Sequence, residues 1–115
     1  MSAIEIKRLN ADVIILAVGS APVMPNIKGI EKAVSGSDAL LGKKSIGENV
    51  IVVGRRLFGC EIAYGYAKEG KQVTIVEALD EIMKLNDVPA MNKTMLTDAF
   101  AYYHTTVLTN IKLKA

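Results

Sequence analysis

The sequence predicts an α/β fold: a three-layer, Rossmann-like parallel sheet with a βαβαβ core, truncated and carrying an extra N-terminal strand. Two short apolar runs, residues 50–53 (VIVV) and 73–77 (VTIVE), are typical of buried parallel strands. An amphipathic stretch of helical length separates them, and glycines lie at both of its ends. Such short links from strand to helix to strand require a parallel, right-handed crossover.

The first element expected along the chain is the extra strand, residues 12–18 (DVIILAV). This run is apolar and rich in β-branched residues, so it predicts a strand buried on both faces. It ends at residues 19–22 (GSAP), where the chain must leave regular structure. We expect this strand to cover the open edge of the strand at 50–54, or two chains to pair at that edge.

Residues 37–41 (SDALL) begin with a capping residue and predict one or two helical turns that stop near Gly42. A longer helix follows Gly54 and ends at Gly70, which suits a left-handed cap. At 100° per residue its expected buried face is made of small residues, which lets the helix lie close to the sheet. That face comprises Gly59, Ala63, Tyr66 and Ala67, flanked by Cys60 and Ile62.

Residues 78–88 are predicted to form a loop, and Pro89 suits the first turn of a helix over residues 90–104. We expect one face of that helix to belong to the core, namely Met91, Met95, Ala99 and Tyr102, with Leu96 and Tyr103 beside it. His104 is interpreted as a C-terminal cap or a surface residue. Residues 106–109 are a third strand. The predicted domains are residues 1–48 and residues 49–115.

Composition excludes several classes of function. The net charge is +2 with the signs mixed along the chain, which argues against a nucleic-acid partner. No apolar run approaches the roughly 18 residues of a membrane span, and the first residues lack a signal-peptide pattern. The single cysteine, Cys60, excludes a disulfide framework, and a packed thiol is its favoured interpretation. We therefore expect a cytoplasmic protein.

The glycine turn after residues 50–53 has the chemistry of a dinucleotide site. A helix N-terminus presents unpaired N–H groups and the positive end of the helix dipole, which attract a pyrophosphate. Gly54 permits the tight turn, and Gly59 permits close packing of helix on strand. Glu77 lies 23 residues after Gly54, where an acid accepts the ribose hydroxyls of NAD and repels the 2′-phosphate of NADP.

Arg56 departs from this pattern, because the fingerprint has glycine at the middle position. Its charge can pair with a phosphate, but its bulk occupies the approach, and a positive φ would add about 1 kcal/mol of strain. Two other hypotheses therefore remain open. One is a structural or assembly module whose dinucleotide site is blocked. The other is a methyltransferase-like Rossmann domain, which also uses a glycine turn and an acid after the second strand.

The order of these motifs resembles a known family. The run GCEIAYGYAKEGKQVTIVEALDEIM followed by VPAMNKTMLTDAF, together with DVIILAVGSAPVMP at residues 12–25, resembles the nucleotide-binding region of 2-enoate and 2,4-dienoyl-CoA reductases. These are Old Yellow Enzyme-related NADH:flavin oxidoreductases. The resemblance implies that residues 1–48 are the tail of an FAD-type domain plus a connecting segment, and that residues 49–115 are an NAD(H)-binding half-domain.

The resemblance also implies cofactors and partners. NAD(H) would bind this chain, while FAD or ADP, FMN and an iron–sulfur centre would belong to the parent flavoenzyme, whose remaining domains would be its partners. We expect the isolated segment to be catalytically inactive and to have no catalytic or metal-ligating residue. Glu61 matches an acid that approaches the nicotinamide in related flavoprotein reductases. The candidate cofactor-binding residues are Ala17, Gly19, Gly54, Arg55, Arg56, Leu57, Phe58, Gly59, Glu61, Glu77 and Ala78.

Overall fold

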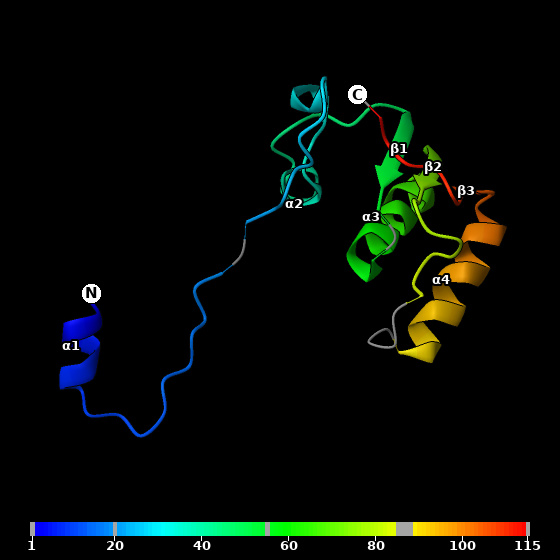
Figure 1. Ribbon diagram of the computed structural model, residues 1–115. Helices are drawn as coiled ribbons and strands as arrows, with labels where there is room; N and C mark the ends of the chain where they lie inside the picture. Colours follow the sequence, from blue (N-terminus) through cyan, green and yellow to red (C-terminus); the bar gives the residue numbers. More distant parts are fainter. Residues whose placement is uncertain (1, 20, 55, 85–88, 115) are drawn as a thin grey trace.

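The computed structural model describes residues 2–19, 21–54, 56–84 and 89–114. Its centre is a parallel three-stranded sheet in the order β1-β2-β3 (Figure 1). The strands are β1 (Asn49–Val53), β2 (Gln72–Val76) and β3 (Thr106–Leu108). The register pairs Ile51 with Thr74 and Thr74 with Thr106. The Rossmann-like parallel sheet predicted from the sequence is confirmed.

Two helices connect the strands and cover one face of the sheet. Helix α3 (Leu57–Lys68) links β1 to β2, and α4 (Ala90–Tyr102) links β2 to β3. Both helices contribute to a single core with β2, formed by Cys60, Ala63, Ala67, Val73, Ile75, Met83, Leu96 and Phe100. On the opposite face Ile51 and Val53 keep 69% and 54% of their surface exposed. The described residues therefore form two layers, not the three that the sequence predicted.

The small-residue face of α3 is confirmed in part. Cys60, Ala63 and Ala67 are buried, as is Ile62, whereas Gly59 and Tyr66 are half-buried. The helix ends in a Schellman motif, in which Gly70 at φ +87° donates to the carbonyl of Ala67. His104, at φ +55°, ends α4 in the same way, so its interpretation as a C-terminal cap is confirmed.

The predicted core face of α4 is wrong at its centre, although Leu96 and Tyr103, expected beside that face, do belong to or pack against the core. Met91 is 83% exposed, and Met95 and Tyr102 are also exposed, while the buried residues are Leu96 and Phe100. Apolar residues lie on more than one face of this helix, so periodicity alone could not identify the face that meets the sheet. Met83, in the loop after β2, supplies core volume that the sequence did not predict.

The extra N-terminal strand is also wrong. Residues 10–19, hereafter the arm, form neither helix nor strand, and every arm residue is exposed. Figure 1 shows the arm, in blue, running away from the sheet toward the short helix α1 (Ala3–Arg8). The expectation that residues 13–18 cover the edge of β1 within one chain is therefore wrong, since the run has a strand-like composition but no paired neighbour among the described residues.

Residues 21–48, which follow the arm and lead to the sheet, contain a 3-10 turn, Ile30–Lys32, and the helix α2 (Gly36–Leu40). The short helix expected near residues 37–41 is confirmed, with Ser35 as its cap: the Ser35 hydroxyl accepts from the Asp38 N–H. Lys71, just before β2, contacts the end of this segment. Its Nζ donates a hydrogen bond to the Ile46 carbonyl oxygen at 3.3 Å and forms an ion pair with the Glu48 carboxylate at 3.6 Å. The predicted division into two domains stays a prediction.

Candidate functional site: the glycine turn at the carboxyl end of the sheet

The turn that follows β1 requires glycine at its first position. Gly54 has φ +117°, a conformation that a side chain would strain, and its N–H donates to the carbonyl of Val76 at 3.1 Å. That hydrogen bond joins the turn to the carboxyl end of β2. The next residue, the predicted contact Arg55, lies outside the described residues.

Gly59 allows α3 to begin directly beneath this turn. A Cβ at Gly59 would lie 2.7 Å from the carbonyl oxygen of Gly54 and 3.7 Å from Cγ1 of Val52. Only glycine allows this approach without a shift of the backbone. The role predicted for Gly59, close packing of helix on strand, is therefore confirmed.

Arg56 is the N-cap residue of α3, with φ −65° and ψ 159°. The expectation of strain from a positive φ is wrong, because an N-cap residue adopts extended backbone that any L-residue tolerates. The Arg56 side chain is exposed and makes no capping hydrogen bond. The first hydrogen bond of the helix runs from the Cys60 N–H to the Arg56 carbonyl. The N–H groups of residues 57–59 therefore have no acceptor within the helix.

Glu77 follows β2 at the same edge of the sheet and is 6% exposed. Its Oε1 accepts a hydrogen bond from the Leu79 N–H at 2.7 Å. Its backbone joins β3, since its N–H donates to the Leu108 carbonyl at 2.8 Å and its own carbonyl accepts from the Ile111 N–H at 2.9 Å. The acid is therefore held at the predicted position, and the residue as a whole is buried.

Cys60 lies in the first turn of α3 and is fully buried. Burial raises the pKa of its thiol to about 11, and the nearby charges of Glu77 and Glu61 raise it further. A thiol with such a pKa stays protonated near neutral pH and is a poor nucleophile. The interpretation of Cys60 as a packed thiol is confirmed.

The remaining predicted contacts are only partly brought together. Phe58, Glu61 and Ala78 are exposed near this edge, and Leu57 packs against the core. Ala17 and Gly19 lie on the exposed arm, which Figure 1 shows extending away from the sheet. The structure thus gathers the glycine turn, the start of α3 and Glu77, but not the two arm residues.

The docking of α2 on the first turns of α3 was not predicted from the sequence. A Cβ at Gly36 would lie 2.6 Å from Cδ1 of Ile62 and 2.8 Å from Cε1 of Phe58. The glycine therefore lets the connecting segment lie against the helix whose N-terminus carries the candidate site. A glycine directly after the capping residue Ser35 was the only local signal of this contact.

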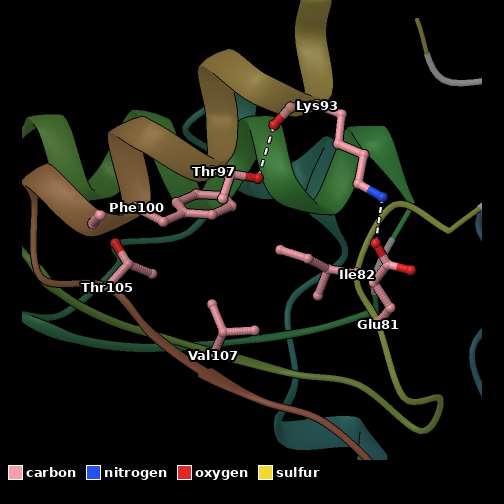
Figure 2. Close-up of a pocket in the computed structure, with 8 residues that line it drawn as sticks. Glu81, Ile82, Lys93, Thr97, Phe100, Thr105 and Val107 are labelled. Atoms are coloured by element: carbon pink, nitrogen blue, oxygen red, sulfur yellow. Dashed lines mark hydrogen bonds and ion pairs between the residues drawn. The ribbon is translucent and has the colours of Figure 1, made fainter. Parts of the chain in front are cut away.

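A separate pocket of about 400 Å³ lies between α4, β3 and the loop after β2. Figure 2 shows the Lys93 ammonium paired with the Glu81 carboxylate at one side, and Phe100 and Val107 across the space. The Thr105 hydroxyl is buried and makes no hydrogen bond with any described residue. None of the predicted site residues lines this pocket.

Within the described ranges, no group of three or more His, Cys, Asp or Glu side chains is placed to hold a metal ion. The same residues contain no helix that is long and apolar enough to cross a membrane.

Comparison with known proteins identifies relatives of this chain. The model of the pyridine nucleotide-disulphide oxidoreductase family matches residues 4–115. A cinnamate reductase from Clostridium sporogenes is 39% identical over 99 residues, which are 85% of this chain and 15% of that protein. An NADH oxidase from Thermoanaerobacter brockii is 47% identical over 83 residues, 67% of this chain and 13% of that protein.

Among solved structures, a 2-naphthoyl-CoA reductase in complex with 2-naphthoyl-CoA matches with a TM-score of 0.77 and 28% identity. The match covers 85% of this chain and 15% of that one. The chain therefore spans about one seventh of the length of the first of these relatives.

Proposed function

This chain belongs to the pyridine nucleotide-disulphide oxidoreductase family, and from that premise we propose that it is the NAD(H)-binding segment of a flavin-dependent oxidoreductase. The observation that carries the proposal is the contact between Gly54 and Gly59, which lets α3 begin at the carboxyl edge of the sheet. The N–H groups of residues 57–59 then supply the donors and the positive dipole end that a pyrophosphate needs. Family membership favours a nicotinamide nucleotide over S-adenosylmethionine.

We propose NAD(H) and not NADP(H) as the ligand. The Glu77 carboxylate repels a 2′-phosphate, and a cation in the following loop would have to compensate for it. Lys84 does not fill that role, because its ammonium contacts both carboxylate oxygens of Asp80 at 2.8 Å. The ribose hydroxyls would have to reach a carboxylate that already accepts the Leu79 N–H.

The finer reaction class is also a proposal. Cinnamate and 2-naphthoyl-CoA, in the names of two relatives, are an unsaturated acid and an aromatic acyl thioester. This chemistry supports a parent enzyme of the Old Yellow Enzyme-related type that reduces activated C=C bonds of the enoate or dienoyl kind. FMN, an iron–sulfur centre and the site for FAD or ADP would lie mainly in the parent's other domains, with Ala17 and Gly19 near the FAD or ADP. We expect the 115-residue chain to bind NADH without turnover, in the cytoplasm.

Calorimetric titration with NADH tests this function. We expect weak binding by the wild-type chain, and a gain of about 1–3 kcal/mol, or about 5- to 150-fold in Kd, for Arg56→Gly, because removal of the side chain opens the approach to residues 57–59. Arg56→Ala should give most of that gain, since the backbone there is extended and needs no glycine. Arg8→Ala is the matched control, with the same change of charge on α1, and should leave the affinity unchanged.

The second candidate function is a structural or assembly module that binds no nucleotide. The burial of Glu77 favours it, because a buried acid offers little surface to a ribose. If neither the wild type nor Arg56→Gly binds NADH while both remain folded, this second function replaces the first.

A further inference from the structure

We propose that Asn110 is a positioning residue for Glu77, because its left-handed backbone lets the chain after β3 hold the loop that carries this acid. The role is indirect and rests on the proposed function, in which Glu77 accepts the ribose hydroxyls of NAD(H). Asn110 acts through Leu79 and not by touching the nucleotide.

The loop after β2 is held by the chain that follows β3. The Asn110 N–H donates to the Leu79 carbonyl at 2.8 Å. The Leu79 N–H in turn donates to Oε1 of Glu77 at 2.7 Å. Leu79 therefore links the two residues: Asn110 fixes its carbonyl, and its N–H fixes the carboxylate of Glu77.

The backbone pairing of Glu77 departs from a regular parallel ladder. Its N–H donates to the Leu108 carbonyl at 2.8 Å, and its carbonyl accepts from the Ile111 N–H at 2.9 Å. These two partners are three positions apart, whereas the evenly spaced bonds of a regular parallel ladder join residues two apart. One extra residue is thus inserted after β3, as in a β-bulge, a feature that often redirects a chain beside an active site. The insertion leaves the Asn110 N–H to bond with Leu79.

This insertion requires a residue that tolerates a left-handed backbone. Asn110 has φ +59°. Asparagine adopts this region more readily than most residues with a side chain, glycine adopts it freely, and a β-branched residue there is strongly strained. Asn10 has a similar φ of +47°, but its N–H donates to the Lys7 carbonyl at the end of α1. The chain therefore offers a matched control at the same residue type and conformation.

The consequence for binding follows from the chemistry of the carboxylate. An ionised carboxylate only accepts hydrogen bonds, so the ribose hydroxyls need it in a defined place. Without the bond from Asn110, the backbone of Leu79 is free to rotate, and the carboxylate of Glu77 loses its position. NADH should then bind more weakly. NADPH should not, because the displaced acid repels its 2′-phosphate less.

The experiment is calorimetric titration of the Arg56→Gly chain with NADH and with NADPH. Adding Asn110→Val should weaken NADH binding about tenfold, the lower end of what a hydrogen bond to a charged group contributes. NADPH binding should stay the same or become stronger, so the ratio of the two affinities falls. Asn110→Gly should keep the affinities of the Arg56→Gly chain, since glycine accepts the left-handed backbone. Asn10→Val is the matched control and should change neither affinity.

Hydrogen exchange without nucleotide, followed by NMR, checks the geometry. The amides of Leu79 and Ile111 should lose protection in Asn110→Val and keep it in Asn110→Gly. If Asn110→Val does not fold, Asn110→Ala, with less strain, replaces it and should act in the same direction.

Two results would overturn the role of Asn110. One is unchanged NADH affinity in the folded Asn110→Val protein, and the other is an equal loss for NADH and NADPH, which a general loss of structure would produce. Absence of NADH binding by the folded Arg56→Gly chain itself is a different outcome. It would refute the proposed function, and the role of Asn110 with it.

Discussion

Replacement of Gly59 by alanine tests whether the close contact beneath the turn is required. The added Cβ would lie 2.7 Å from the carbonyl oxygen of Gly54 and 3.5 Å from its carbonyl carbon. Both are backbone atoms of Gly54, which has φ +117° and whose N–H is hydrogen-bonded to the Val76 carbonyl. The turn therefore cannot move away easily. We expect α3 to shift and the protein to lose stability.

The magnitude follows from two opposing terms. Overpacking of this kind costs about 1–3 kcal/mol. Alanine in place of glycine within a helix contributes about 1 kcal/mol of stability. Gly65 lies on the same helix, and a Cβ there meets nothing within 4 Å, so Gly65→Ala should show only the second term. The difference in unfolding free energy between the two variants should thus be about 1–3 kcal/mol.

Urea unfolding followed by far-UV circular dichroism measures this difference. If the two variants have the same m-value, the shift in the midpoint urea concentration reports the change in unfolding free energy. Gly59→Ala should unfold at a lower urea concentration than the wild type or near it, and Gly65→Ala at a higher one. The reasoning would be refuted if Gly59→Ala were as stable as Gly65→Ala, because the backbone contact would then impose no constraint.

Two further predictions concern packing near the site. Gly36→Ala should lower the unfolding free energy by about 1 kcal/mol, since its Cβ meets the side chains of Ile62 and Phe58 and not backbone; Gly47→Ala, with nothing within 4 Å, is the control in the same urea assay. Burial raises the pKa of the Cys60 thiol to about 11 in the folded state, against about 8.5 for an ordinary cysteine. Between these two pH values the thiol ionises in the unfolded state but not in the folded state, so the unfolding free energy falls as pH rises from about 8.5 to about 11. The stability of Cys60→Ala should therefore fall less over that pH range, and equal slopes for the two proteins would contradict this reasoning.

Much of the fold could be predicted because it depends on local patterns. The bounds of β1, β2, α3, α4 and β3 lie within a few residues of the predicted ones, since each element carries its own apolar period and its own terminating residue. Gly54 and Gly59 could be assigned their roles for a similar reason. A turn needs a left-handed residue, and a helix packed beneath it needs a residue without a side chain.

The errors share a cause in contacts between distant parts of the chain. The arm was predicted as a strand, but a strand needs a paired neighbour, and composition cannot supply one. The centre of the core face of α4 was misassigned, because Phe100 and the flanking Leu96, not Met91 and Met95, are buried. Arg56 was expected to be strained, yet its place at the helix N-cap allows extended backbone.

The sequence by itself determined the parallel βαβαβ order, the two essential glycines and an acid after the second strand, since these follow from spacing along a few dozen residues. Only the tertiary structure decided how far that acid is buried, that α2 docks on α3 through Gly36, and that the arm is left unpaired. These three features depend on which distant surfaces meet. The packing free energy of such surfaces depends on which residues come into contact in the folded chain, and no local sequence pattern specifies those contacts.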